Sequence, residues 1–229
     1  MIVCDDIRFA YGETVVLRGV SLTVDDSACT LLRGRSGGGK TTLLRILSRL
    51  MPADSGRLRI DSHNVDFSDG TAGRPISFHA APLSTLSMLH QQNNLWPNLT
   101  VSENIALVTD GDKTCTLGKE AISLLEMLDV GSLTDRFPTQ CSVGQRQRIA
   151  VARIILSPAK HVLMDEPTSA LDGANRKKVR DLVHQEIKKG RSFLIISHDD
   201  RDFAGAYNRL YELENGLATE LTSQIPTPP

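Results

Sequence analysis

The stretch Gly34-Arg35-Ser36-Gly37-Gly38-Gly39-Lys40-Thr41 decides the fold of this chain. It matches the spacing G-x-x-x-x-G-K-[ST] and lies between the apolar run Leu31-Leu32 and an amphipathic run, which is the strand-to-helix context of a phosphate-binding loop. Glycines let the backbone curl so that N–H groups point inward, and the following helix adds its positive end. This concavity suits a di- or triphosphate, with Lys40 as a mobile cation and the Thr41 hydroxyl on the accompanying Mg²⁺. The alternative, a glycine-rich turn with an incidental lysine, is disfavoured by both flanks.

Length and charge limit the class of protein. The chain has 229 residues, which suits one large α/β domain or a core with an inserted subdomain. Lys and Arg number 26 against 27 Asp and Glu, so no global basic field indicates nucleic acid or an anionic membrane. No apolar stretch approaches the ~18 residues that span a bilayer, and Asp5 and Asp6 stand where a secretory signal would be basic. Four cysteines without metal-ligand spacing favour buried thiols in a reducing, cytoplasmic compartment: Cys4, Cys29, Cys115 and Cys141.

The first part of the chain is typical of an antiparallel sheet followed by a βα unit. Residues 2 to 24 alternate between apolar and polar side chains and are interrupted at Tyr11-Gly12-Glu13, which predicts a meander. Local packing and stacking on a purine both remain open for Tyr11. The helix after the phosphate loop is predicted to end near Met51-Pro52, and residues 58 to 60 are predicted to form a short strand. Residues 61 to 85 are polar and irregular.

Residues 93 to 158 are predicted to form a helical insert between two α/β parts, 1 to 92 and 159 to 220. Thr100-Val-Ser-Glu103 is a capping box that begins one helix, and a second helix is predicted over 119 to 128. Ser142-Val-Gly-Gln145 is another capping box, and its helix ends before Pro158. The exposed N–H groups at this helix start are either simply capped or receive a phosphate. The expected inward residues of the first two helices are Val101, Ile105, Leu107, Val108, Ile122, Leu125 and Leu128.

Two buried strands are predicted to end at residues that carry chemistry. Val162-Leu-Met164 precedes Asp165 and Glu166, and Phe193-Leu-Ile-Ile196 precedes His198. Ligands of open α/β sheets bind at the carboxyl ends of such strands. One carboxylate would hold Mg²⁺ and the other would orient or deprotonate a water molecule. An acidic turn and a surface histidine are the simpler alternatives. Between these strands a solvent-facing helix is predicted over 174 to 189, with Val179, Leu182, Val183 and Ile187 inward.

Taken in order, the motifs resemble the ATP-binding subunit of ABC transporters over essentially the whole chain. The matching segments are Gly34 to Thr41, Gln91, Cys141-Ser-Val-Gly-Gln145, Met164-Asp-Glu-Pro167, Ser169-Ala-Leu-Asp172 and His198. The resemblance implies an α/β fold: a P-loop NTPase (RecA-like) core with an N-terminal antiparallel β subdomain and an inserted α-helical subdomain. It also implies ATP and Mg²⁺ as ligands, and ATP hydrolysis coupled to transmembrane transport.

The resemblance further implies roles for single residues. Tyr11 would stack on adenine, Glu166 would be the catalytic base, and His198 would hold the γ-phosphate. Asp172 would belong to a loop that crosses a dimer interface. Mg²⁺ would be bound or sensed by Thr41, Gln91 and Asp165. The nucleotide would be contacted by Gly34, Arg35, Ser36, Gly37, Gly38, Gly39, Lys40, Thr41 and Thr42 of one protomer and by Ser142, Gly144 and Gln145 of the other.

One motif departs from the family pattern, because the usual Leu-Ser-Gly-Gly-Gln is Cys141-Ser-Val-Gly-Gln145 here. Val143 places a β-branched side chain where the family has none, so it is expected to crowd the approach to the partner's nucleotide. The segment Gln91 to Asn104, together with His63 to Phe67, is similar to the polar amino-acid uptake branch, in particular the arginine type.

That branch implies a head-to-tail homodimer beneath transmembrane permease subunits, peripheral on the cytoplasmic side of the inner membrane. A periplasmic solute-binding protein would be an indirect partner, and no nucleic acid is expected. An exporter or lipoprotein-release system remains an alternative within transport. A soluble ABC ATPase acting on ribosomes or DNA is less favoured, because such chains usually carry two cassettes or a long coiled-coil insert. Residues 221 to 229 are expected to be a disordered tail.

Overall fold

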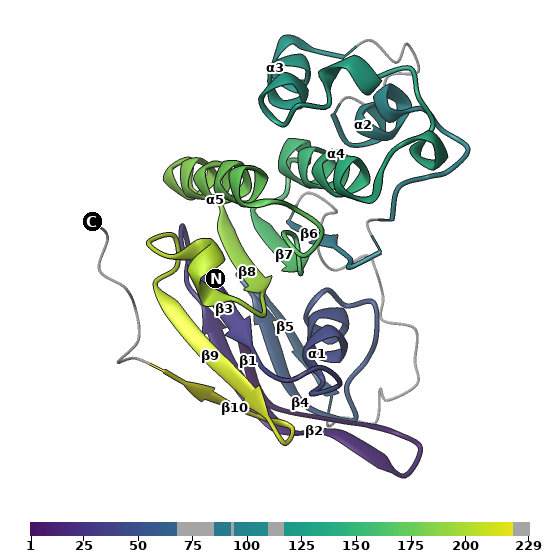
Figure 1. Ribbon diagram of the computed structural model, residues 1–229. Helices are drawn as coiled ribbons and strands as arrows, with labels where there is room; N and C mark the ends of the chain where they lie inside the picture. The colour runs from purple at the N-terminus through teal and green to yellow at the C-terminus, as the bar shows by residue number, and fades with distance from the viewer. Residues whose placement is uncertain (68–84, 93, 110–116, 222–229) are drawn as a thin grey trace.

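The computed structural model describes residues 1–67, 85–92, 94–109 and 117–221. An antiparallel sheet faces a second, mostly parallel sheet, and helices cover the far side of the second sheet (Figure 1). The antiparallel strands pair in the order β2-β1-β4-β5, with Ile2 opposite both Val24 and Ile60, so the meander predicted over residues 2 to 24 is confirmed. These strands are β1 (Ile2–Tyr11), β2 (Thr14–Val24), β4 (Ser55–Ile60) and β5 (His63–Asp66).

The second sheet has the strand order β10-β9-β3-β8-β7-β6 among the described residues. The strands from β9 to β6 are parallel, and β10 is antiparallel at the edge. Every residue of β7 and β8 is buried, as expected for central parallel strands that are covered on both faces. The strands are β3 (Cys29–Arg33), β6 (Leu86–Leu89), β7 (His161–Asp165), β8 (Ser192–Ile196), β9 (Arg209–Glu214) and β10 (Leu217–Glu220).

The parallel sheet separates two apolar cores, because successive side chains of a strand point to opposite faces. Leu32, Leu163 and Leu194 pack with the antiparallel sheet and with α1 (Lys40–Leu47). The alternate residues of the same strands pack beneath α4 (Val143–Leu156) and α5 (Gly173–Lys188). The parallel sheet is therefore packed on both faces, and this packing holds in place the strand ends from which the loops at its carboxyl edge begin. The alternate residues are Leu31, Met164 and Ile195.

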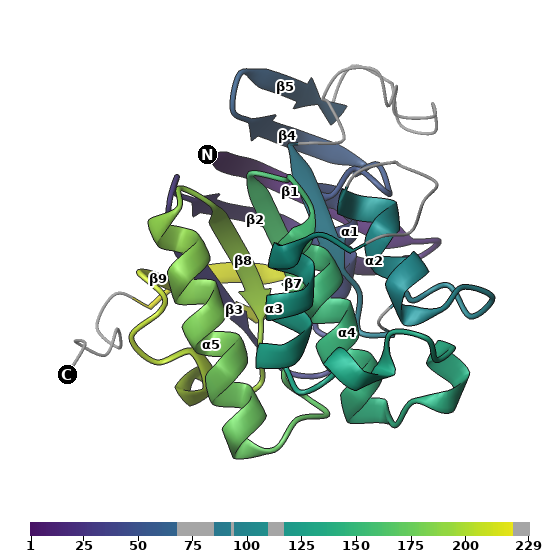
Figure 2. The ribbon, with the colours of Figure 1, turned by 90° about the horizontal axis from the view of Figure 1, so that it is seen from above.

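The described part of segment 94–158 forms helices and turns that lie beyond the parallel sheet (Figures 1 and 2). Both predicted capping boxes are confirmed. The Thr100 hydroxyl accepts from the Glu103 N–H at 3.2 Å, and the Ser142 hydroxyl accepts from the Gln145 N–H at 3.2 Å. The elements besides α4 are α2 (Val101–Thr109), α3 (Lys119–Met127), η3 (Gly131–Leu133) and η4 (Pro138–Gln140).

The helix after the phosphate loop ends earlier than predicted, at Leu47 rather than near Met51. Arg49 has a φ of 62°, and its N–H bonds to the Ile46 carbonyl while the Leu50 N–H bonds to the Arg45 carbonyl. This pair of bonds is a Schellman motif, which closes a helix C-terminus. The helix therefore stops by its own capping geometry, before the proline.

Two of the residues predicted to face inward are exposed. Leu107 of α2 has an exposed fraction of 55%, and Ile122 of α3 one of 45%. On α2 the buried face is formed instead by Val101, Asn104 and Ile105. A polar residue takes part in this face because its hydrogen-bonding groups are satisfied internally, which helical periodicity cannot show. On α5, Val179, Leu182 and Val183 are buried as predicted, with Ile187 partly buried.

Strands β5, β9 and β10 were not predicted. β5 is a short edge strand within a polar region, so alternation gave little signal. The β9–β10 hairpin had a clear local signal, because Asn215-Gly216 joins the strands with φ values of 52° and 78°. As expected, Cys4, Cys29 and Cys141 are free buried thiols. The fourth cysteine, Cys115, and residues 222 to 229 of the expected tail lie outside the described residues.

Candidate active site

The phosphate-binding loop connects β3 to α1 at the carboxyl edge of the parallel sheet. Gly34, Gly37 and Gly39 have φ values of 153°, 76° and 94°, all positive. At Gly34 a Cβ atom would lie 2.3 Å from the Leu213 carbonyl oxygen, so only glycine fits against β9 there. At Gly37, which lines a cavity, a Cβ atom would meet no other atom within 4 Å, so the space beside this residue is open. The structure thus contains the curled backbone that the sequence predicts.

Lys40 is 6% exposed, and its ammonium group lies inside this loop. It donates to the carbonyl oxygens of Gly34 at 2.7 Å and Arg35 at 2.9 Å. Burial lowers the Lys40 pKa, while the charges of Glu166 and Asp165 act in the opposite direction. Lys40 is therefore held against the loop by uncharged acceptors, for which an anionic phosphate oxygen is a stronger substitute.

Thr41 and Asp165 form the pair expected at a magnesium site. The Thr41 hydroxyl donates to Asp165 Oδ2 at 2.7 Å, across 124 positions of sequence. Asp165 is 2% exposed, and burial raises its pKa, while the Thr41 hydrogen bond and the Lys40 charge lower it. Hydroxyl and carboxylate oxygens beside a phosphate loop are ligands that Mg²⁺ accepts, so the donor set fits that ion.

Glu166 follows Asp165 and is held from two sides. His198 Nε2 lies 2.7 Å from Glu166 Oε1, and Gln91 Nε2 donates to Oε2 at 3.2 Å. Glu166 has a φ of 51°, a left-handed conformation that is rare for a non-glycine residue and typical of functional sites. Its side chain is 14% exposed, whereas His198 is 53% exposed. The carboxylate, at the end of β7, is thus positioned by two neighbours that follow the ends of β6 and β8.

Gln147 is a site residue that the sequence analysis missed. Its side chain projects from α4, is 2% exposed and donates to the Glu166 carbonyl oxygen at 3.2 Å. This contact satisfies the carbonyl of a residue in a strained conformation and links Glu166 to the helix that begins at Ser142. A signal was present, because Gln147 is a polar residue on the apolar side of α4.

A cavity of about 340 Å³ lies along the phosphate loop and reaches part of this site. It extends from Tyr11, which is 49% exposed, along the phosphate loop to Gln91 and Glu166. The Tyr11 ring packs edge-on against Phe9 with 4.8 Å between ring centroids, so local packing explains its orientation, and its place in the cavity wall also allows stacking on a base. The lining residues besides these are Val16, Ser36, Gly37, Gly38, Gly39, Lys40, Thr41 and Thr42.

The residues predicted to contact a second nucleotide are not part of this cavity. Ser142 and Gln145 cap the N-terminus of α4, and a Cβ atom on Gly144 would lie 3.1 Å from the Ala170 carbonyl oxygen. Asp172 caps α5, where the N–H of Asn175 lowers its pKa. The α4 N-terminus and the loop before α5 therefore lie against each other, outside the lining of this cavity.

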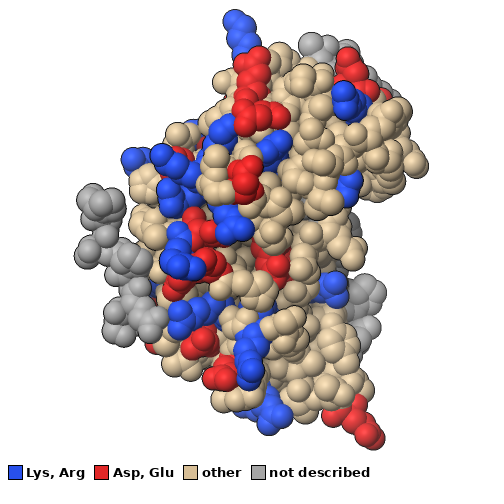
Figure 3. Space-filling model, viewed as in Figure 1, with Lys and Arg blue, Asp and Glu red and all other residues tan. Residues whose placement is uncertain are grey.

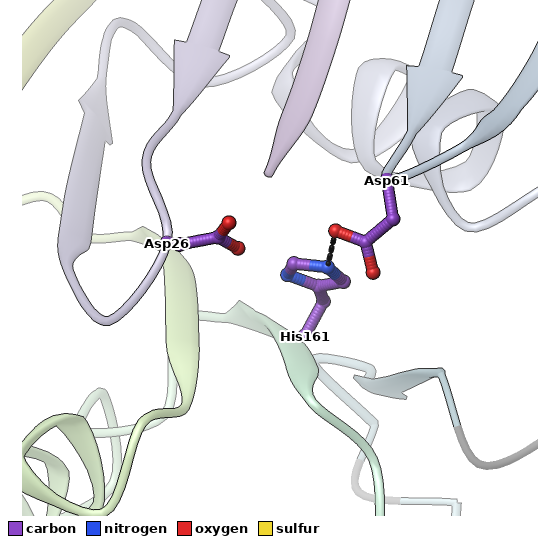
Figure 4. Close-up of side chains that lie close together, drawn as sticks. All are labelled: Asp26, Asp61 and His161. Atoms are coloured by element: carbon purple, nitrogen blue, oxygen red, sulfur yellow. Dashed lines mark hydrogen bonds and ion pairs between the residues drawn. The ribbon is translucent and has the colours of Figure 1, made fainter.

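A second cluster of possible metal ligands lies at the opposite edge of the sheet. Asp26, Asp61 and His161 each offer one ligand atom within 4.8 Å of the others (Figure 4). However, Lys160 Nζ lies 3.0 Å from the Asp26 carboxylate and 2.9 Å from that of Asp61. The carboxylates are neutralised by protein cations, and His161 Nε2 lies 3.1 Å from Asp61. This arrangement is an ion-pair network that joins the two sheets.

A groove of about 550 Å³ lies on the helical side of the molecule. Its walls include Trp96, Leu107 and Arg153, and the exposed fractions of Trp96 and Leu107 are 60% and 55%. This groove explains the exposed face of α2, because the leucine that was expected in the core lines it. No helix within the described ranges combines the length and the apolar character needed to cross a bilayer.

Comparisons with known proteins define the class to which this fold and site belong. The family model described as "ABC transporter" matches residues 17–169. The chain therefore belongs to the ABC transporter family as an ATP-binding cassette, and it is an ATPase by class. The fold class predicted from sequence is confirmed: an α/β P-loop NTPase core with an antiparallel β subdomain and a helical part.

Individual relatives cover most of the chain. It is 34% identical over 93% of its length to the lipoprotein-releasing system ATP-binding protein LolD of Porphyromonas gingivalis, covering 95% of that protein. It is 31% identical over 95% of its length to the arginine transport ATP-binding protein ArtP of Haemophilus influenzae, covering 90% of it. A ribose import ATP-binding protein, RbsA of Bacillus licheniformis, is 32% identical but is covered over only 44% of its length.

A solved structure gives the corresponding match in three dimensions. The dimeric ATP-binding cassette MJ0796, in a post-hydrolysis state bound to ADP and Pi, superposes with a TM-score of 0.79 at 25% identity. The match covers 96% of this chain and 99% of that one. The relatives include lipoprotein-release and arginine types alike, so ATP-driven transport is common to them and the transported solute is not.

Proposed function

We propose that this chain hydrolyses ATP as one half of a head-to-tail homodimer that drives a membrane transporter. The observation that carries the proposal is the convergence of two sets of contacts beside the cavity: Thr41 hydrogen-bonded to Asp165, and Glu166 held between Gln91 and His198. Hydrolysis of a bound triphosphate needs cation ligands beside the phosphates and a base beside the attacking water. Both sets of groups lie here at the same edge of the parallel sheet.

In this proposal each residue of the site has one role toward the nucleotide, the metal ion or the attacking water. Lys40 would exchange loop carbonyls for phosphate oxygens, and Thr41, Asp165 and Gln91 would hold Mg²⁺, whose charge would offset that of the phosphates. Glu166 accepts the proton of the attacking water, and His198 binds the γ-phosphate. The backbone of residues 34–39 donates to the phosphates, and Tyr11 stacks on the adenine. The remaining nucleotide contacts come from Arg35, Ser36 and Thr42.

The proposal of a dimer rests on residues that are predicted to contact nucleotide but do not line the cavity of their own chain. Ser142, Gly144 and Gln145 form a helix start next to the loop of Asp172, and none of them lines the cavity at the phosphate loop. A second copy turned head to tail would place this surface over the nucleotide of the first. The dimeric cassette with ADP and Pi is a structural relative that supports this arrangement.

The groove at Trp96 and Leu107 is the surface proposed to receive the transmembrane permease subunits. It is mostly apolar, and its lining includes residues 94 to 96, which follow Gln91 closely in sequence. A partner seated there would act on Gln91, which donates a hydrogen bond to the proposed catalytic base, Glu166. Both charge signs are interspersed on the face in Figure 3, with no single-sign field across it. Docking is therefore proposed to depend on apolar fit.

For the transported solute, the proposal is amino-acid import of the arginine type, supported by the similarity to ArtP along both chains. A periplasmic solute-binding protein would then deliver the solute. Lipoprotein release is the second candidate, because LolD proteins of two organisms match at 34% and 35% identity over 95% and 91% of their lengths. Copurification of the membrane partner from the native cell separates these candidates: a permease of an amino-acid system supports the first, and a lipoprotein-releasing complex supports the second.

The catalytic assignment is tested with Glu166→Gln. We expect ATP binding to persist while turnover falls by ~10²–10⁴-fold, the usual contribution of a positioned base. With ATP and Mg²⁺ the variant should elute as a dimer on gel filtration. Lys40→Ala is the control and should lose ATP binding in calorimetry. A Glu166→Gln protein that hydrolyses normally and stays monomeric would place the base elsewhere.

A further inference from the structure

Asp202 lies on η5 (Asp200–Phe203), four positions after His198, and its side chain is 13% exposed. Its two carboxylate oxygens have different partners. Oδ2 accepts from the Thr168 hydroxyl at 2.8 Å, and Oδ1 lies 3.3 Å from Arg176 Nη1. A mostly buried carboxylate that is bonded to two separate elements restrains both of them.

Both partners belong to the segment that follows Glu166. Thr168 is 2% exposed and stands two positions after Glu166. Arg176, on the first turns of α5, also donates through Nε to the Leu171 carbonyl oxygen at 2.8 Å, just before Asp172. One carboxylate therefore anchors the beginning of this loop directly and its end through a single arginine.

Asp202 is also linked through the backbone to the loop that carries His198. The Asp202 N–H bonds to the Asp199 carbonyl at 3.2 Å, and Ser197 and Asp199 are hydrogen-bonded on either side of the histidine. His198 itself is 53% exposed, so packing does not fix it. A cavity of about 230 Å³ separates the two segments, with Thr168, His198 and Asp202 in its walls. Across this space, hydrogen bonds rather than close packing set the spacing.

We propose that Asp202 is a positioning residue for ATP hydrolysis, which locks the His198 loop and the loop after Glu166 into one unit. The unit holds His198 against the Glu166 carboxylate and fixes the position of the backbone just before Asp172. This inference rests on the proposed roles of Glu166 and His198. Asp202 does not reach the cavity that would hold ATP, so its loss should affect the chemical step and leave nucleotide binding nearly unchanged.

The test is a double-mutant cycle with Asp202→Ala and Thr168→Val, the second being nearly isosteric. We expect each single variant to lower kcat by ~10–10²-fold, the effect of a small misplacement of reacting groups, with the Kd for ATP within ~2-fold of wild type. The double variant should be no slower than the slower single variant, because both remove the same contact. Asp202→Asn, which keeps an acceptor for Thr168, should recover most of the turnover. Asp181→Ala, an exposed acid on α5, is the matched control and should behave as wild type.

Additive losses in the cycle, or an unchanged kcat in Thr168→Val, would overturn the proposal. If Asp202→Ala does not fold, Thr168→Val and Asp202→Asn still decide it. Glu166→Gln is measured in parallel. Normal turnover there would overturn the site assignment and this inference together, whereas slowed turnover with unaffected Thr168→Val would overturn this inference alone.

Discussion

At position 143 a valine side chain projects from the first turn of α4 and is 58% exposed. The next position is different, since a Cβ atom on Gly144 would press on the Ala170 carbonyl. Within the chain a side chain at 144 would meet a tight backbone contact, whereas the side chain at 143 is exposed. We therefore predict that any cost of Val143 arises against a second protomer, where the valine would crowd the proposed approach of Ser142 to the partner's nucleotide.

Val143→Gly is expected to raise the ATPase activity of the isolated protein severalfold. Relief of a clash of about a few tenths of a kcal/mol at each of two composite sites is enough for such a change. Val143→Ala separates the effect of side-chain size from that of backbone freedom, because alanine shortens the side chain without the conformational freedom of glycine. Steady-state turnover measures both variants, alone and in complex with the membrane subunits. Unchanged or lower turnover in the isolated Val143→Gly protein would show that the valine is tolerated packing.

The start of α2 depends on one buried amide. Asn104 is fully buried, and its Nδ2 donates to the carbonyls of Trp96, Leu99 and Thr100 at 3.1, 3.1 and 2.9 Å. Its Oδ1 accepts from the Trp96 N–H at 2.8 Å. The loop that carries Trp96 to the groove is thus fastened to the helix through the hydrogen bonds of one side chain.

Asn104→Ala should lower the free energy of unfolding by about 2 kcal/mol or more, because several backbone groups lose a buried partner. Chemical denaturation measures this loss. Trp96 is the one tryptophan of the sequence, so its fluorescence reports on the loop directly, and quenching by acrylamide should increase. Asn98→Ala, an exposed asparagine of the same loop, is the control. Equal stability and equal quenching in both variants would mean that the loop is held by other contacts.

At the scale of the whole molecule, the network of Asp26, Asp61, Lys160 and His161 joins the two sheets. Burial lowers the His161 pKa from its ordinary 6.5, with the hydrogen bond to Asp61 acting in the opposite direction. Its Nδ1 is buried without a hydrogen-bond partner, which is consistent with a neutral ring that donates through Nε2. Burial raises the Asp61 pKa. Hydrogen bonds from the N-terminal amine of Met1, from Lys160 and from His161 outweigh this effect and hold the Asp61 pKa well below its usual range.

The protein should therefore lose stability on acidification. A histidine with a lowered pKa in the folded state contributes stability above its unfolded pKa of 6.5, and this contribution is lost as the pH falls through the lowered value. We expect the free energy of unfolding to decrease as the pH falls below the unfolded pKa of 6.5. His161→Gln keeps a donor for Asp61 without the titration and should flatten this dependence. A slope that is unchanged in the variant would assign the acid sensitivity to other groups.

Much of the fold and site could be predicted because the signals are local. The phosphate loop, both capping boxes and the apolar strands before Asp165 and His198 depend on neighbours a few positions away, so the sequence alone determined them. The same locality explains the errors. Leu107 was assigned to the core because periodicity cannot show that Asn104 is satisfied internally, and α1 ended at a Schellman motif rather than at Pro52.

Only the tertiary structure decided how the site is assembled. The contacts of Glu166 with Gln91 and His198, and those of Gln147 and Asp202 behind it, join elements far apart in the sequence. No local pattern specifies such contacts, because they depend on the register of parallel strands and on the packing of α4 and α5 against the sheet. The sequence determined which groups are available, and packing on both faces of the parallel sheet determined which of them meet.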